Sequence, residues 1–168
     1  MNILKHKVKL NLKEIFKTRR KFSQSYVVKP EDIKLPSDLG EIKEPISLYV
    51  EITKDKGAYK VYMEIEGYVV LECSRCLTLY HKDVGKKEVV RVEPYPTKDV
   101  VYLKPADLEV SFYEDEEAFD LTNLLREQII LSIPTKPLCS PDCMTGFEIS
   151  LKEERTTLGD LLKKSNVL

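Results

Sequence analysis

The chain has 168 residues, of which 42% are hydrophobic and 33% are charged, with 27 Lys and Arg against 28 Asp and Glu. This composition excludes an intrinsically disordered chain, and the length is sufficient to bury a substantial core. The longest apolar runs have only a few residues, which excludes a membrane span. Because lysines interrupt the apolar residues near the N-terminus, we also expect no secretory signal.

The net charge of -1 conceals an uneven distribution of charge. Residues 1–29 contain nine basic side chains and one acid, a net charge of +8, which leaves -9 for the rest of the chain. This pattern predicts a basic N-terminal arm that faces a polyanion, although a lysine-rich surface also fits a heat-adapted protein. Within the arm, an arginine pair beside an aromatic ring can hold phosphates and stack on a base. The candidate RNA contacts in the arm are Lys7, Lys9, Lys13, Lys17, Arg19, Arg20, Lys21 and Phe22.

Residues 7–13 alternate between polar and apolar, which predicts a half-buried strand with Lys7, Lys9 and Lys13 along a phosphate-facing edge. Alternation resumes at residues 48–52 and continues at 59–65, and Lys54-Asp55-Lys56-Gly57 between them has the composition of a hairpin turn.

Several further strands follow the hairpin. Gly67 interrupts the alternation and is a candidate bulge. Strands are then predicted at 67–72, 77–84, 89–93 and 108–113. Together these segments predict an antiparallel sheet that can curl towards a barrel.

The last third of the chain changes in character. Residues 105–120 contain seven acids and no base, which is typical of a solvated surface loop. Asp120 is a good N-cap for a helix with Leu121, Leu124, Leu125 and Ile129 at helical spacing, which Pro134 ends. A capping-box pattern predicts a second, short helix at 157–165.

All four cysteines belong to two close pairs, Cys73-x2-Cys76 and Cys139-x3-Cys143. Two thiolates in one tight turn can bind the same tetrahedral ion, and a second such turn completes the ligand set. The pattern therefore predicts one structural metal ion on Cys73, Cys76, Cys139 and Cys143. Zinc suits four sulfur ligands best, but iron binds in the same geometry, and the sequence does not separate the two.

Three other interpretations of the cysteines remain open: two local disulfides, a redox dithiol, and thiols without a ligand. The first two require an oxidising compartment or a Cys-x-x-Cys at the start of a helix, and the sequence favours neither. A catalytic metal is disfavoured because four sulfur ligands leave no open position. His81 shares the parity of Leu77 and Leu79, so we expect a packed or rim histidine and not a ligand.

The sequence contains no positive sign of catalysis. It has two histidines, no recognisable nucleophile motif and no glycine-rich phosphate loop. We therefore expect a protein that is not an enzyme.

Two segments together resemble the YceD family. The stretch from Gly67 to Cys76 (GYVVLECSRC), followed by LTLYHK, is similar to the strand, Cys-x-Arg-Cys, strand motif of that family. The stretch from Phe119 to Cys139 (FDLTNLLREQIILSIPTKPLC) is similar to its second motif, an aspartate-capped helix with a proline-terminated end. The basic N-terminal arm is also similar. Here, however, Cys143 is followed by no further cysteine, whereas many similar members have another Cys-x-x-Cys.

The resemblance implies a bacterial or organellar protein of the cytoplasm that is needed for accumulation of large-subunit ribosomal RNA, through its synthesis, processing or stability. The implied partner is ribosomal RNA or a pre-ribosomal particle, which Arg75 in the first cysteine pair can also contact. Arg75 can equally be a residue that stabilises the metal-binding turn.

We therefore expect a single YceD-like domain, residues 1–168, of class α+β. It would comprise the basic arm 1–29, a mainly antiparallel sheet with one principal helix joined by a four-cysteine metal clip over 46–147, and the helix 157–165. The expected function is non-catalytic binding of ribosomal RNA. The alternative is a zinc-containing adaptor that docks a ribosomal protein or processing enzyme through the acidic loop 114–117.

Overall fold

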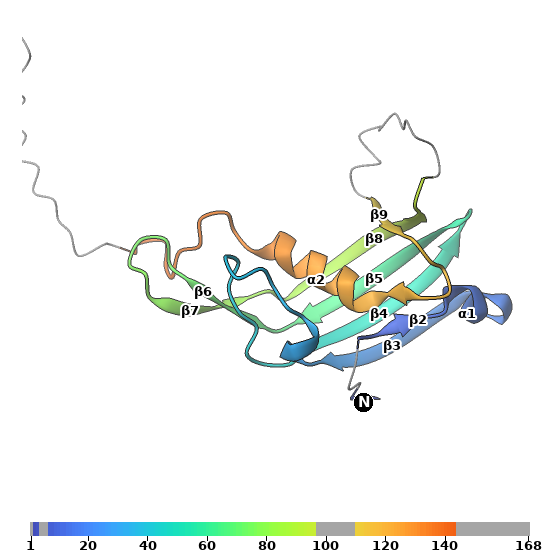
Figure 1. The fold of residues 1–168 in the computed structure, drawn as a ribbon, viewed down its shortest axis with the longest axis horizontal. Helices are drawn as coiled ribbons and strands as arrows, with labels where there is room; N and C mark the ends of the chain where they lie inside the picture. The colour runs from blue at the N-terminus through green and yellow to red at the C-terminus, as the bar shows by residue number, and fades with distance from the viewer. Residues whose placement is uncertain (1, 4–6, 97–109, 144–168) are drawn as a thin grey trace, which may run out of the picture.

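The computed structural model describes residues 2–3, 7–96 and 110–143. Six strands form its main sheet: β1 (Asn2–Ile3), β3 (Lys21–Val28), β4 (Ile46–Asp55), β5 (Ala58–Glu66), β8 (Lys86–Pro94) and β9 (Val110–Tyr113). Their order across the sheet is β1-β3-β4-β5-β8-β9 (Figure 1). The inner pairs are antiparallel, whereas β1 with β3 and β8 with β9 are parallel.

Smaller elements complete the fold. Two short antiparallel sheets pair β2 (Lys9–Leu10) with β10 (Phe119–Asp120) and β6 (Tyr68–Glu72) with β7 (Leu79–Asp83). The helices are α1 (Leu12–Thr18), the 3-10 helix η1 (Pro30–Asp32) and α2 (Leu121–Ser132). The predicted α+β class with a mainly antiparallel sheet is confirmed.

The core lies between one face of the main sheet and α2, which crosses that face (Figure 1). On β4, Ile46, Leu48, Val50 and Ile52 are all at most 1% exposed, because alternate side chains of a strand point to the same face. Leu121, Leu125 and Ile129 of α2 are fully buried in the same cluster. Burial of this apolar surface is the main favourable term in folding and fixes the register of the strands.

The hairpin between β4 and β5 confirms the turn predicted at residues 54–57. Lys56 and Gly57 both have positive φ angles, 46° and 88°. Two consecutive residues in this conformation make the turn that best matches the twist of antiparallel strands. The turn places Lys21 of β3 opposite Thr53 of β4, near this end of the sheet.

Gly67 lies at the break where the chain leaves β5 of the main sheet and enters β6. The sequence predicted a bulge here, and the structure has a gap between two strands that belong to different sheets. A Cβ atom at Gly67 would lie 2.4 Å from Cδ1 of Ile46, so the end of that buried side chain would have to move to accept one.

The principal helix has the predicted limits. The Oδ1 atom of Asp120 accepts a hydrogen bond of 2.9 Å from the backbone N–H of Asn123, which caps the first turn. The helix ends at Ser132, two residues before Pro134.

The sheet is open, so the predicted curling into a barrel is wrong. Closure requires the two edge strands to pair. In the described ranges β1 pairs only with β3 and β9 only with β8, and these edge strands have two and four residues. The helix α2 covers the apolar face instead.

The described part of the basic segment, residues 7–29, packs into the fold. The strand predicted at residues 7–13 is reduced to β2, because the Oδ1 atom of Asn11 accepts a hydrogen bond of 2.8 Å from Glu14 N–H and begins α1. Val8, Leu12, Tyr26 and Val28 from this segment are buried in the core.

The helix predicted at residues 157–165 lies outside the described residues. Within the described part of the chain, neither α-helix has the length and apolar character needed to cross a membrane.

Glycine substitutions test the packing between the loop before β4 and β6. Gly40 has a φ of 95°, and a Cβ atom there would lie 2.5 Å from the carbonyl oxygen of Val70. Gly57 has a φ of 88° but nothing within 4 Å of such an atom. We expect Gly57→Ala to cost about 1 kcal/mol of unfolding free energy from backbone strain alone, and Gly40→Ala to cost at least about 2 kcal/mol more. Equal losses in urea denaturation would contradict this account.

Candidate metal centre and basic surface

The four cysteines converge at one end of the molecule, where the β6–β7 hairpin meets the segment after α2 (Figure 1). Each Sγ atom lies within 4.8 Å of the other three. Cys73 and Cys143 are 3.6 Å apart at their Sγ atoms, and Cys76 and Cys139 are 3.7 Å apart. The structure thus brings together the four residues that the sequence selected, although 62 residues separate the two pairs.

Backbone hydrogen bonds shape the two turns that hold the cysteines. The N–H of Cys73 donates to Thr78 (3.0 Å), and the N–H of Leu77 donates back to Cys73 (2.9 Å). The N–H of Ser74 donates to the carbonyl oxygen of Pro137 (2.8 Å), which links the hairpin to the second turn. The second turn closes through Cys143 N–H and the carbonyl oxygen of Ser140 (3.2 Å).

The thiols have very different proton affinities. Hydrogen bonds from the backbone, first from Cys76 and then from Cys139, lower the pKa of Cys73 to about 6. Hydrogen bonding with the neighbouring thiols, first Cys139, raises the pKa of Cys143 to about 12. Four thiolates this close repel one another, and a bound cation removes that repulsion. The donor set fits a tetrahedral zinc or iron ion with four sulfur ligands.

The alternative of two local disulfides does not fit this arrangement. The short sulfur contacts join Cys73 to Cys143 and Cys76 to Cys139, across the two turns and not within them. Both distances are also far longer than the roughly 2.05 Å of a disulfide bond.

Arg75 connects the two turns. Its Nη1 atom donates a hydrogen bond of 3.0 Å to the carbonyl oxygen of Cys143. This contact supports the stabilising role that the sequence left open, and RNA contact by Arg75 stays a prediction. His81 lies exposed on β7 with its ring 6.5 Å from that of Tyr68, outside the cysteine cluster.

The predicted RNA contacts are distributed over three elements. Lys7 and Lys9 lie before and in β2, whereas Lys13 lies on α1, so the three do not form one strand edge as predicted. Lys17, Arg19, Arg20, Lys21 and Phe22 follow in order from the end of α1 into β3.

The residues at the junction of α1 and β3 differ in whether their side chains are exposed and free of ion pairs. Lys21 Nζ forms an ion pair of 2.7 Å with Glu51, and the ring of Phe22 packs partly buried against the core. Within the described chain, Lys17, Arg19 and Arg20 are exposed and have no carboxylate partner. These three residues are called the basic corner below.

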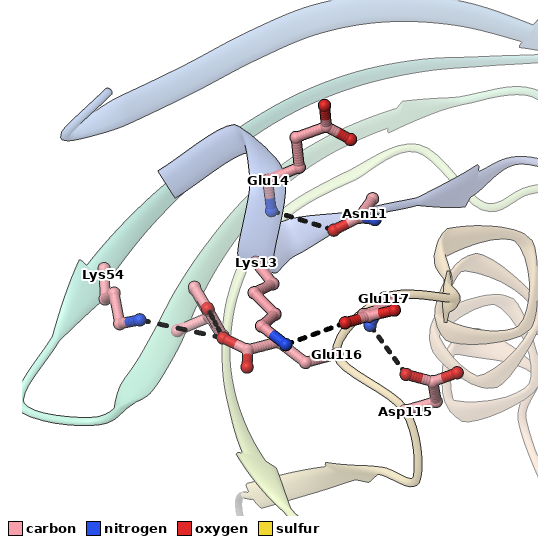
Figure 2. A network of polar contacts seen from close by, with 8 residues as sticks. Asn11, Lys13, Glu14, Lys54, Asp115, Glu116 and Glu117 are labelled. Carbon is pink, nitrogen blue, oxygen red and sulfur yellow. Dashed lines mark hydrogen bonds and ion pairs between the residues drawn. The ribbon is translucent and has the colours of Figure 1, made fainter. Parts of the chain in front are cut away.

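The acidic loop between β9 and β10 packs against α1 and the β4–β5 hairpin (Figure 2). Lys13 Nζ contacts Glu117 at 2.8 Å, and Lys54 Nζ lies 3.7 Å from Glu116. The hydroxyl of the buried Tyr59 donates to Glu116 as well. A solvated loop is therefore the wrong prediction for Glu116. No local pattern indicates these contacts, because Lys13 and Glu117 are 104 positions apart.

These observations define a class: an α+β domain in which four cysteine sulfurs join a sheet hairpin to the end of a helix, in the manner of a structural metal site. The family model described as "Large ribosomal RNA subunit accumulation protein YceD" matches residues 61–160, and the chain belongs to the YceD family. The matched range includes α2 and all four cysteines but not the basic corner. No curated protein and no solved structure matches the chain.

The metal site is tested by elemental analysis of the full-length protein. We expect one zinc or iron ion per chain, and less than about half of that in Cys139→Ser, because the remaining three sulfurs no longer complete the tetrahedral set. Ser140→Ala, the neighbouring control, should retain the ion. Protons compete with the metal for thiolates, so the ion should also leave as the pH falls. Wild-type protein prepared without chelator that lacks both metals would contradict the site.

The acidic loop is tested by removing single carboxylates. Glu116→Ala leaves the hydroxyl of buried Tyr59 without its acceptor, and we expect a loss of about 1–3 kcal/mol in unfolding free energy. Glu114→Ala removes an exposed carboxylate of the same loop and should change stability by less than about 0.5 kcal/mol. Urea denaturation compares the two variants, and a loss for Glu114→Ala as large as for Glu116→Ala would show that Tyr59 is not the cause.

Proposed function

We propose that the protein is a non-catalytic, cytoplasmic factor that supports accumulation, processing or stability of large-subunit ribosomal RNA by binding that RNA or a pre-ribosomal particle. Membership of the YceD family implies the role in ribosomal RNA accumulation. Direct contact with the RNA, the absence of catalysis and the location are our proposals.

The observation that carries RNA contact is the basic corner. Its three cations have no carboxylate partner among the described residues, whereas their neighbours Lys13 and Lys21 form ion pairs with Glu117 and Glu51. Unpaired cations on a protein surface attract phosphates, and two adjacent arginines can each hold one with paired hydrogen bonds. Lys7, Lys9, Lys13, Lys21, Phe22 and Arg75 remain candidates of the second rank, because the structure places them apart, pairs them or partly buries them.

The metal, which we propose to be zinc with iron as the alternative, has a structural role in this account. Its four sulfur ligands would come from Cys73, Cys76, Cys139 and Cys143, and bound there it would neutralise the thiolates. It lies at the opposite end of the main sheet from the basic corner (Figure 1). The two sites are therefore expected to act independently.

Docking of a ribosomal protein or processing enzyme through the acidic loop 114–117 is less favoured. Glu116 and Glu117 already contact Tyr59, Lys54 and Lys13 of the same chain. A partner would have to break these contacts, so the loop offers fewer free carboxylates than the sequence suggested.

RNA contact is tested by measuring binding to a large-subunit ribosomal RNA fragment over a range of salt concentrations. The double variant Arg19→Ala, Arg20→Ala should bind at least tenfold more weakly, and the slope of log affinity against log salt should fall by about 1.5, since each lost phosphate contact removes roughly 0.7–0.9.

The matched control is the double variant Lys60→Ala, Lys87→Ala, which removes the same charge from the exposed face of the sheet. Those lysines are paired with Asp55 at 3.4 Å and Glu64 at 2.6 Å. Equal affinity of the two double variants would reject the basic corner as the RNA contact.

A further inference from the structure

A groove lies between the β6–β7 hairpin, the loop before β4 and the end of α2. Its volume is about 1000 Å³. The apolar part of the lining comes from all three walls and includes Leu35, Leu39, Leu79, Ile130, Ile133 and Pro137. A groove of this size can take several apolar side chains of a partner.

The cysteine cluster holds two of the three walls together. Ser74, between Cys73 and Cys76, lines the groove, and its N–H donates to Pro137, which lines the facing wall. The third wall is attached by a reciprocal pair of backbone hydrogen bonds between Glu41 and Val70, of 3.0 and 2.8 Å. Metal binding at the cysteines would therefore fix the shape of the groove.

The groove combines exposed apolar side chains with acidic residues. Leu79 in the lining is 60% exposed, and Leu131, next to the lining residue Ile130 on α2, is 74% exposed. Leucines this exposed beside an apolar groove are typical of an interaction surface. Asp38, Glu41 and Glu72, called the acidic rim below, also line the groove, and Lys43, which is 3.8 Å from Glu41, is the one cation among the described residues of the lining.

The chemistry of the walls selects the kind of partner. The edge of β6 that faces the groove is already bonded to Glu41, so a partner strand cannot add there. The groove can instead bind the side chains of a partner, as when an amphipathic helix lies in an apolar groove. An excess of carboxylates at the rim requires basic residues beside the apolar face of that helix.

We propose that this groove binds an amphipathic helix with basic flanks from a protein partner. The site differs from the acidic loop and from the basic corner, and it goes beyond RNA binding. Residues 144–168, which follow Cys143, are the competing occupant. They contain four acids and four bases, so their zero net charge does not complement the acidic rim.

The test uses the full-length, metal-loaded protein and a synthetic, fluorescein-labelled amphipathic peptide of leucines and lysines, called the lysine peptide. Fluorescence anisotropy measures its binding. A peptide with glutamates in place of the lysines should bind at least tenfold more weakly. The variant Leu79→Asp should also weaken binding at least tenfold. Val89→Asp is the control, because Val89 is equally exposed at 62% but lies on β8, outside the groove lining.

A second variant keeps the test valid if Leu79→Asp fails to fold. The double variant Asp38→Lys, Glu72→Lys changes only exposed residues of the rim. It should weaken binding of the lysine peptide at least tenfold. Binding of large-subunit ribosomal RNA should not weaken in Leu79→Asp, which separates failure of this proposal from failure of the proposed function. Removal of the metal should also weaken binding of the lysine peptide, because the wall that contains Ser74 is then no longer held in place.

Four outcomes would overturn the proposal: no binding of the lysine peptide, equal binding of the glutamate peptide, equal weakening by Val89→Asp, or unchanged binding by metal-free protein. A fifth concerns the competing occupant. If a photoreactive phenylalanine at position 79 crosslinks to residues 144–168 of the same chain in the absence of peptide, the groove belongs to that segment.

Discussion

The convergence of four cysteine sulfurs is the constraint on which one end of this protein depends, where the β6–β7 hairpin meets the segment after α2. The β6–β7 hairpin is a separate two-stranded sheet that reaches the core through Val69 and Leu71, and the segment after α2 has no regular structure from Ile133 to Cys143. Hydrogen bonds of Ser74 and Arg75, residues between Cys73 and Cys76, join the two segments. A metal ion that links the segments closes a long loop of the chain, and such cross-links are expected to stabilise most when the loop is long. Such a link would also fix the walls of the apolar groove.

The charges of the chain partly neutralise one another within the fold. The basic N-terminal segment and the acidic loop meet at Lys13 and Glu117, and the exposed face of the sheet pairs Lys21, Lys60 and Lys87 with nearby acids. Behind the net charge of -1, therefore, many cations already form ion pairs with acids of the same chain. Among the exposed cations that the described ion pairs leave free, Lys17, Arg19 and Arg20 lie together at the junction of α1 and β3, far from the cysteines (Figure 1).

Local patterns predicted the elements whose causes are local. The turn at Lys56 and Gly57, the cap at Asp120 and the spacing of the cysteines all follow from residues a few positions apart. The open sheet, the contact of Tyr59 with Glu116 and the groove depend on segments that meet only in three dimensions. The helix α1 was missed because Val8, Leu10 and Leu12 have the alternation of a strand, whereas the capping hydrogen bond of Asn11 begins a helix. Asn11, a residue type that often caps the start of a helix, was the sequence signal that could have predicted α1.

The central claim is that one metal ion with four sulfur ligands joins the hairpin to the end of α2. X-ray absorption spectroscopy at the zinc or iron edge of the purified protein tests it directly. The account predicts a single shell of four sulfur atoms at about 2.3 Å for zinc. A shell with nitrogen or oxygen ligands, or with fewer than four sulfurs, would contradict it.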